Sequence, residues 1–373
     1  GRRYTPWIVG GMATLAAGGA GAAWATTLIG RHFALGTALA ALCFALIGCG
    51  VRACGTSLLV LMAKRVAEER RAAAATAVWM MMIAGFAVTA TVAGKLLDPF
   101  SPARLIAVAG GVSGVALLVS IAAIWGVEGR AAPAAAPPAA AREGRPAFRA
   151  ALAQVWAEPD ARRFTAFVFV SMLAYSAQDL ILEPFAGAVF AFSPGESTKL
   201  SGAQHGGAFA GMLLVALATS AFKGRPAASL KGWVVGGCAA SGLAMAALAL
   251  AGLRGGPWPL RENVFLLGVA NGVFSIAAIG SMMTLAGRGQ GSREGVRMGL
   301  WGAAQAIAFG AGGFAGTMFV DFMKWLIGPS GAAYSFVFAL EAVGFFVAYW
   351  LALGTTFRQP AEAVSLDGAS PAE

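Results

Sequence analysis

The sequence contains few charged residues and few of the residues that build metal or disulfide sites. Asp, Glu, Lys and Arg make up 12% of its 373 residues, and it has 2 histidines and 4 cysteines. No two cysteines form a C-x-x-C pair and all four lie in apolar segments, so neither zinc nor a disulfide framework is indicated. A phosphate-binding loop, a dinucleotide-binding motif and a catalytic triad are also missing. We therefore expect no enzymatic activity and no catalytic residues.

Hydrophobic residues are abundant in contrast, and they occur in long uncharged runs. They account for 58% of the chain. These runs reach the ~20 residues that a helix needs to cross a bilayer. They lack the alternation of apolar and polar residues that is typical of membrane barrels. The sequence therefore predicts an all-α polytopic membrane protein, with long runs at residues 7–30, 105–127, 232–253, 263–287 and 298–320.

Ten membrane spans can be drawn from these runs and the charged loops between them. With the first residue in the cytoplasm, 19 Lys and Arg residues fall in cytoplasmic segments and 7 in the opposite loops. The positive-inside rule then places both termini of the sequence in the cytoplasm. The net charge of +10 comes mainly from these loops and does not indicate nucleic acid binding. The spans are expected to start near Trp7, Phe33, Ala73, Ala103, Phe164, Lys199, Lys231, Arg261, Arg297 and Gly331.

The longest connection between spans divides the chain into two halves. It contains RAAPAAAPPAAAREGRP, whose alanines and prolines offer no hydrophobic face, as is typical of a linker. We expect an N-terminal half of four spans at residues 1–127 and a cytoplasmic linker at 128–163. A C-terminal half of six spans at 164–357 and a cytoplasmic tail at 358–373 complete the chain.

An internal repeat relates the two halves. Residues 1–11, GRRYTPWIVGG, are similar to residues 229–237, SLKGWVVGG, and further positions match at an offset of 222. Two parallel repeats of six helices are the arrangement of major facilitator transporters. Because the C-terminal half begins with two spans that have no counterpart, we expect that the first two of twelve helices are missing from this sequence. The matching positions are Arg71 with Arg293, Trp79 with Trp301, Gly94 with Gly316 and Asp98 with Val320. In the last pair the second aspartate, Asp321, lies one residue beyond the matching position.

An acidic pair lies inside the fifth expected span. Gln178, Asp179 and Glu183 precede Pro184, which is expected to kink or end the helix. Asp179 and Glu183 are four residues apart, so a helix places both carboxylates on one face. An ionisable residue that faces lipid costs at least ~2.5–3.5 kcal/mol, which favours a bound ligand or a partner. The alternative is a structural pair that caps the kinked end of the helix.

The next span brings two further polar residues to a similar depth. Gln204 and His205 lie roughly 8–9 Å below the outer surface, because that span descends from Lys199. A short loop joins the two spans, so the sequence predicts one shared polar cluster of Gln178, Asp179, Glu183, Gln204 and His205 in the outer half of the membrane.

Three isolated polar residues lie in other spans. Arg52 is about 18 Å from the cytoplasmic side and needs a partner or a cavity, with Glu341 and Asn271 as candidates at similar depth. A structural ion pair between helices and a substrate-binding role are both open. Because the last helix is usually peripheral in this architecture, Glu341 is expected to contact a partner polypeptide or a pigment at the edge of the bundle.

Several motifs carry a resemblance to a known family. They are AYSAQDLILEPFAG followed by GESTKLSGAQHGG, the early GRRYTPW, DPFSPARLI, and SREGVRMGLWGAAQA. Together they resemble the bacteriochlorophyll delivery family, the PucC-like branch of the major facilitator superfamily, over essentially the whole chain. One region departs from the family pattern, because VRACGTSLLVLMAKRVAEE carries Arg52 and no aspartate. This departure favours a divergent member.

The resemblance implies a function in pigment handling. Members are implicated in supplying bacteriochlorophyll to light-harvesting complexes, or in assembling them, in photosynthetic bacteria. It implies a protein of the bacterial inner, photosynthetic intracytoplasmic membrane that binds bacteriochlorophyll or a precursor. The implied partners, besides the lipid bilayer, are light-harvesting or reaction-centre polypeptides or a chlorophyll synthase. A carboxylate, amide or imidazole of the polar cluster would ligate the chlorin magnesium, with His205 as the candidate metal ligand.

Two other functions remain open. A proton-coupled transporter of a small polar solute would use Asp179 or Glu183 as its proton carrier. The central helices offer few polar groups beyond Arg52, Asn271 and Gln305, which disfavours a polar solute. The third possibility is a structural subunit of a photosynthetic complex.

Overall fold

The protein is a bundle of long α-helices. The computed structural model describes residues 4–67, 70–128, 153, 155–221, 229–286 and 294–355. This part of the chain contains ten helices that are long and apolar enough to cross a membrane. They begin within five residues of the expected starts, so the all-α, ten-span prediction is confirmed. The helices are α1 (Thr5–Ile29), α2 (Phe33–Arg65), α3 (Arg71–Leu96), α4 (Pro102–Ile124), α6 (Pro159–Phe190), α7 (Pro194–Ala221), α8 (Leu230–Arg254), α9 (Leu260–Ala286), α10 (Glu294–Ile327) and α11 (Gly331–Gly354).

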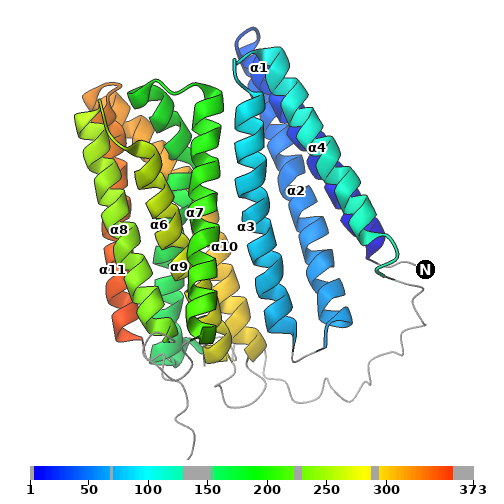
Figure 1. Ribbon diagram of the computed structural model, residues 1–373, viewed down its shortest axis with the longest axis vertical. Helices are drawn as coiled ribbons and strands as arrows, with labels where there is room; N and C mark the ends of the chain where they lie inside the picture. The colour runs from blue at the N-terminus through cyan, green and yellow to red at the C-terminus, as the bar shows by residue number, and fades with distance from the viewer. Residues whose placement is uncertain are drawn as a thin grey trace, which may run out of the picture.

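The helices form two groups (Figure 1). Helices α1 to α4 lie together on one side, α6 to α11 lie together on the other, and α3 and α7 run side by side between them. We call the end of the bundle where α4 ends and α6 begins the linker side, and the opposite end the far side. Most of the expected linker, residues 129–152 and 154, and the expected tail at 358–373 lie outside the described residues.

Helix α6 differs from the sequence prediction at two prolines, one at its start and one inside it. The helix begins at Pro159, five residues before the expected Phe164. Proline fits the first turn of a helix, and the negative charge of Asp160 is stabilised by the positive end of the helix dipole. Pro184 does not end the helix. It continues to Phe190, and Ala191 closes it in the left-handed conformation. Glu183 is therefore followed by nearly two further helical turns.

Equivalent helices pack in the same way in both halves. In the N-terminal half α1 packs against α2 and α4, and in the C-terminal half α8 packs against α9 and α11. Glycines permit the close approach in both: a Cβ on Gly11 would lie 2.7 Å from the backbone of Cys54, and one on Gly237 would lie 2.7 Å from Phe274. These shared relations match two parallel repeats, with α1 to α4 equivalent to α8 to α11.

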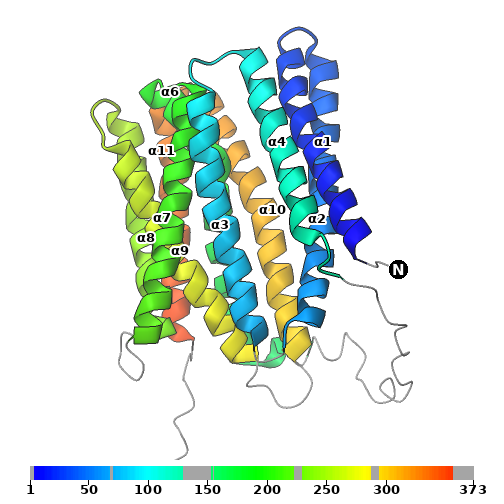
Figure 2. The same ribbon diagram turned by 45° about the vertical axis from the view of Figure 1, so that its right-hand side comes forward.

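The main contact between the halves, within the described residues, is the pair α3 and α7. A Cβ on Gly202 would lie 2.6 Å from the Thr91 hydroxyl, so the two helices meet almost backbone to backbone. On the far side Lys199 Nζ lies 2.5 Å from Asp98 Oδ2, and Ser193 donates a 2.9 Å hydrogen bond to Asp98 Oδ1. Figure 2 shows α3 in front of the C-terminal helices. The halves are thus joined by close packing and by a polar contact at the far side.

The apolar core is concentrated in the C-terminal half. Buried aromatic rings pack there between α6, α9, α10 and α11, whereas the N-terminal half has a small cluster around Ile8, Leu61 and Ile124. The C-terminal half is therefore the more rigid support for a site. Its largest fully buried side chains include Trp301, Phe164, Phe167, Phe185, Phe274, Phe338 and Phe345.

Glu128, which the sequence analysis did not single out, connects helices of the N-terminal half on the linker side. Glu128 accepts 2.7 Å hydrogen bonds from the backbone N–H groups of Tyr4 and Thr5 and a 2.6 Å bond from the Thr5 hydroxyl. Arg65, the last residue of α2, donates to the Glu128 carbonyl oxygen. A negative charge at a helix start satisfies free N–H groups and complements the helix dipole. Glu128 thus joins α1, α2 and the residues after α4.

Candidate intramembrane site

A small cavity lies between the two halves, beside the α3–α7 contact. Its volume is about 150 Å³, and side chains from α3, α6, α7, α9 and α10 line it. Aromatic rings and methionines make up half of the lining residues, and Asp179, His205, Ser275 and Gln305 are its polar members. The apolar lining residues are Trp79, Met82, Ile83, Phe86, Val168, Met172, Tyr175, Met212, Ala278, Ile279, Met282 and Phe309.

Helix α6 presents Asp179 to this cavity. Its side chain lines the cavity, and its carboxylate accepts one long hydrogen bond of 3.4 Å from Gln204 Nε2 of α7. Gln204 itself is buried, with 4% of its surface exposed. A carboxylate with a single weak partner keeps most of its hydrogen-bonding capacity for another group. Asp179 can therefore accept a proton or a hydrogen bond from a molecule in the cavity.

The second carboxylate belongs to a polar chain that ends at His205. Ser201 donates a 2.6 Å hydrogen bond to Glu183 Oε1, and the Ser201 carbonyl oxygen lies 2.8 Å from His205 Nδ1. Because a carbonyl oxygen only accepts, Nδ1 must carry the proton in this hydrogen bond. Nε2 then keeps its lone pair. The edge-to-face contact with Phe86, at 5.3 Å between ring centroids, further fixes the imidazole plane.

This arrangement suits metal ligation by the imidazole. Histidines that bind metals usually donate their other N–H to a carbonyl or carboxylate, which fixes the tautomer and makes the free nitrogen more basic. His205 meets that condition through Ser201. It could supply a single axial ligand, and no group of three His, Cys, Asp or Glu side chains suited to a bare metal ion occurs in the described ranges.

The structure brings together four of the five residues of the expected cluster. Asp179, Glu183, Gln204 and His205 meet at the α6–α7 contact, whereas Gln178 is fully buried and forms no hydrogen bond with either Gln204 or His205. The capping alternative does not hold, because α6 continues past Glu183 to Phe190. The role of these four residues in ligand binding stays a prediction.

The other three residues do not form the expected pair. Arg52 is exposed on α2, while Glu341 is 5% exposed and lies where α11 packs on α6, so no ion pair joins them. The expectation of an edge position for Glu341 is wrong, since α11 packs between α6 and α8 and turns Glu341 inward. Asn271 is buried and accepts a 2.9 Å hydrogen bond from Ser241.

Trp79 is a cavity residue that the sequence interpretation noted only as a repeat position. Its indole Nε1 is buried and has no acceptor within the described part of the chain. An indole N–H is a donor only, and when buried it usually finds a partner. The Trp79 indole therefore lines the cavity, but its N–H group lies within the wall and not at the cavity surface.

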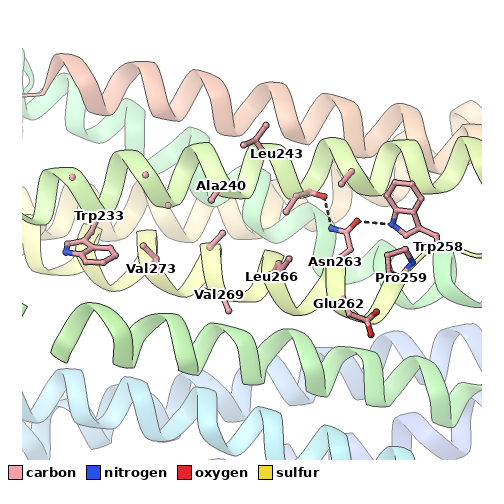
Figure 3. Close-up of a pocket in the computed structure, with 16 residues that line it drawn as sticks. Trp233, Ala240, Leu243, Trp258, Pro259, Glu262, Asn263, Leu266, Val269 and Val273 are labelled. Atoms are coloured by element: carbon pink, nitrogen blue, oxygen red, sulfur yellow. Dashed lines mark hydrogen bonds between the residues drawn. The ribbon is translucent and has the colours of Figure 1, made fainter. Parts of the chain in front are cut away.

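A larger groove runs between α8 and α9, away from this cavity. Its volume is about 790 Å³, and Figure 3 shows it extending from Trp233 to Trp258. At the far-side end Asn263 accepts a 3.1 Å hydrogen bond from Trp258 Nε1 and donates one of 3.1 Å to the Ala244 carbonyl oxygen. No histidine or cysteine lines it, so it lacks a strong axial ligand. Its walls suit hydrocarbon, and the small residues Gly232, Gly236, Ala240 and Ala244, spaced by four, were the sequence signal for it.

The fold and the cavity define a polytopic membrane protein whose helices form two groups around a small internal cavity. Two helical repeats enclose a space that holds a carboxylate and an oriented imidazole. A family model described as PUCC protein matches residues 1–359. The chain therefore belongs to the PucC family.

Two relatives identified by sequence agree with this assignment, and one solved structure is reported beside them. A Rhodobacter capsulatus protein named "Bacteriochlorophyll synthase 44.5 kDa chain" is 48% identical over 364 residues, which cover 96% of this chain and 82% of the relative. A "Protein PucC" of Rhodobacter capsulatus is 29% identical over 84% of this chain and 67% of its own length. Among solved structures, the human organic anion transporter MFSD10 (TETRAN) matches 94% of this chain and 77% of its own, with 18% identity and a TM-score of 0.49.

Proposed function

We propose that the protein binds bacteriochlorophyll or a precursor inside the membrane and passes it to light-harvesting or reaction-centre polypeptides, or to a chlorophyll synthase. The observation that supports this proposal most is the orientation of His205. Its Nδ1 is hydrogen-bonded to the Ser201 carbonyl oxygen, so that Nε2 is free in an apolar, aromatic cavity. Such a nitrogen can ligate the central magnesium of a chlorin. The relative named for bacteriochlorophyll synthase supports this choice of ligand.

The polar groups of the cavity also suit the rim of a chlorin. Asp179 has one weak partner and can accept a hydrogen bond from a donor group of the ligand. Methionines such as Met172 and Met212 adapt to irregular apolar surfaces. These side chains would fix the orientation of a flat apolar ligand while leaving it unchanged. We infer a carrier without catalytic chemistry.

The size of the cavity sets a condition on binding. At about 150 Å³ it is smaller than the ~300–1,000 Å³ of pockets that hold drug-sized ligands. A chlorin therefore requires the two halves to separate around α3 and α7. The same rearrangement would open a path for the pigment toward a partner in the membrane.

Pigment retention tests this function. The protein is purified from a pigment-producing host in mild detergent, and its bound chlorin is measured by absorbance and by mass spectrometry. His205→Ala should lower bound pigment about 10-fold or more, the scale of loss seen when even a partner of a metal ligand is removed. His32→Ala is the matched control, because the other histidine is exposed in the loop before α2. Colourless wild-type protein, or equal pigment in both variants, would overturn the proposal. A covalently altered pigment would instead indicate an enzyme.

A proton-coupled transporter remains a second candidate on one observation. Asp179 faces the cavity with a single weak partner, as a proton-carrying carboxylate should. Uptake of a solute driven by a proton gradient, abolished by Asp179→Asn, would favour it. We also propose that the linker side faces the cytoplasm of a photosynthetic membrane, on the distribution of basic residues.

A further inference from the structure

Four buried polar side chains lie in the interior of the C-terminal half, apart from the central cavity. Gln178 and Ser241 are 0% exposed, Asn271 is 1% exposed and Glu341 is 5% exposed. They belong to α6, α8, α9 and α11, respectively, so each helix contributes one. Buried polar groups are costly unless they are hydrogen-bonded.

The packing around Phe274 places these four residues at one depth. The Phe274 ring contacts Tyr175 of α6 and Phe345 of α11, and its backbone meets Gly237 of α8. Helices α6 and α8 run in one direction and α9 and α11 in the other. The level one helical turn closer to the far side than Phe274 therefore lies three or four residues later in α6 and α8. In α9 and α11 it lies three or four residues earlier. Those positions are Asn271 on α9, Gln178 on α6, Glu341 on α11 and Ser241 on α8.

Most of the polar atoms at this level have no partner. Ser241 donates a 2.9 Å hydrogen bond to Asn271 Oδ1. Asn271 Nδ2, both amide atoms of Gln178 and both carboxyl oxygens of Glu341 are buried without a hydrogen bond to any described residue. The unmatched set thus holds two amide donors, one amide acceptor and a complete carboxyl group.

No positive charge compensates Glu341. The basic residues of α6, α8, α9 and α10 that the structure describes lie near the ends of those helices, and α11 has none. The titratable groups at nearby levels are Tyr175 and Asp179 of α6 and Cys238 of α8, and Asp179 faces the central cavity. An ionised carboxylate buried without a counter-charge or hydrogen bonds is strongly disfavoured, and such a group takes up a proton instead.

The protonated acid fits its surroundings better than a metal cation would. A carboxylic acid offers one O–H donor and one acceptor, and the Gln178 amide offers the complementary acceptor and donor. Asn271 directs its Oδ1 to Ser241, so its NH₂ group is the part left for the cluster. An NH₂ group repels a cation but can donate to a carboxyl oxygen.

We propose that Glu341, together with Gln178, Asn271 and Ser241, forms a proton-binding site in the core of the C-terminal half. Gln178 and Asp179 are consecutive in α6. Gln178 points to the proposed proton site, whereas Asp179 lines the cavity. A tilt or rotation of α6 that widens the cavity also changes the surroundings of the bound proton. The site stands whether or not the cavity binds a chlorin.

Infrared difference spectroscopy of the purified full-length protein tests the site directly. The spectrum of wild type minus Glu341→Gln at neutral pH should contain the C=O stretching band of a protonated carboxylic acid, shifted in heavy water. Glu262→Gln, on the exposed first turn of α9, should give no such band. A carboxylate band in place of the acid band, or a band that appears only when sodium is removed, would overturn the proposal.

Thermal stability of the same variants gives an independent measurement. Glu341→Gln replaces the acid by a neutral group of equal size and should keep the melting temperature of wild type at neutral pH. Glu341→Ala leaves a cavity and unpaired amides, and should lower it by several degrees. Equal losses in both variants, or a failure of Glu341→Gln to fold, would show that the ionised form is required and would contradict the site. In Gln178→Leu the acid band should move, since its partner is lost.

Discussion

At the residue scale, the orientation of His205 depends on a backbone atom. Its Nδ1 donates a hydrogen bond to the carbonyl oxygen of Ser201. The hydroxyl group of the same serine donates a separate hydrogen bond to Glu183. The two carboxylates of α6 therefore have separate environments: Asp179 faces the cavity, while Glu183 is half-buried and bonded to α7. On the proposed function, the imidazole and Asp179 would contact the ligand, and Glu183 would support them through Ser201.

Ser201→Ala separates these two roles. It removes the donor to Glu183 but leaves the carbonyl oxygen that orients His205. Loss of one hydrogen bond to a charged group should lower stability by about 1–3 kcal/mol. Bound pigment, measured by absorbance, should change little compared with the loss in His205→Ala. If Ser201→Ala loses pigment as completely as His205→Ala, Glu183 takes part in binding.

At the scale of helices, α3 and α7 approach closely and form the main joint between the two halves. Gly202 faces Thr91 and the backbone of α3, and Gly94 faces the backbone of Gly195 and Lys199. Interlocking small residues allow this contact in lipid, where packing replaces the hydrophobic effect as the force between helices. The joint borders the cavity, and on the proposed function it would have to open for a chlorin to enter.

Gly202→Val should force the two helices apart. A side chain there would overlap Thr91, at an expected cost of about 1–3 kcal/mol, the range of overpacking. Gly206→Val is a matched control on the same helix, because a Cβ there meets nothing within 4 Å. The melting temperature and the yield of a cysteine cross-link between α3 and α7 report the effect. Equal behaviour of both variants would mean that the contact does not hold the halves together.

At the scale of the molecule, the halves are also held by the far-side ion pair of Asp98 and Lys199. The hydrogen bond from Lys199, with a second one from Ser193, lowers the pKa of Asp98 below its ordinary value. Because the folded protein favours the ionised carboxylate, this contribution is present above the ordinary aspartate pKa of about 3.9. It disappears as the pH falls through the lowered pKa.

Asp98→Asn should therefore open the far side more often at neutral pH and remove its acid dependence. The distance between spin labels attached to the far-side ends of α3 and α7 should be longer in the variant at pH 7 and should converge with wild type in strong acid. Asp321→Asn, at the neighbouring position of the repeat and exposed on α10, should leave the distance unchanged. A wild-type distance that is identical at both pH values would contradict the role of this ion pair in holding the far side closed.

Much of the architecture could be predicted from the sequence because each span has a strong local signal. The short loop between α6 and α7 similarly dictated that Asp179, Glu183, Gln204 and His205 would meet. The helical phase of neighbouring residues could not be predicted, since it depends on which helices surround α6, and so Gln178 was placed with the wrong partners. The inward position of Glu341 results from packing between distant segments, which leaves no local pattern.

The contacts of Glu128 have a mechanical consequence. The residue that leads out of α4 is bonded to the first turn of α1 and receives a hydrogen bond from the last residue of α2. Tension on the chain that follows α4 would thus be shared among three helices at a single anchoring point. A partner that pulls there would move these three helices together and would not detach a single one.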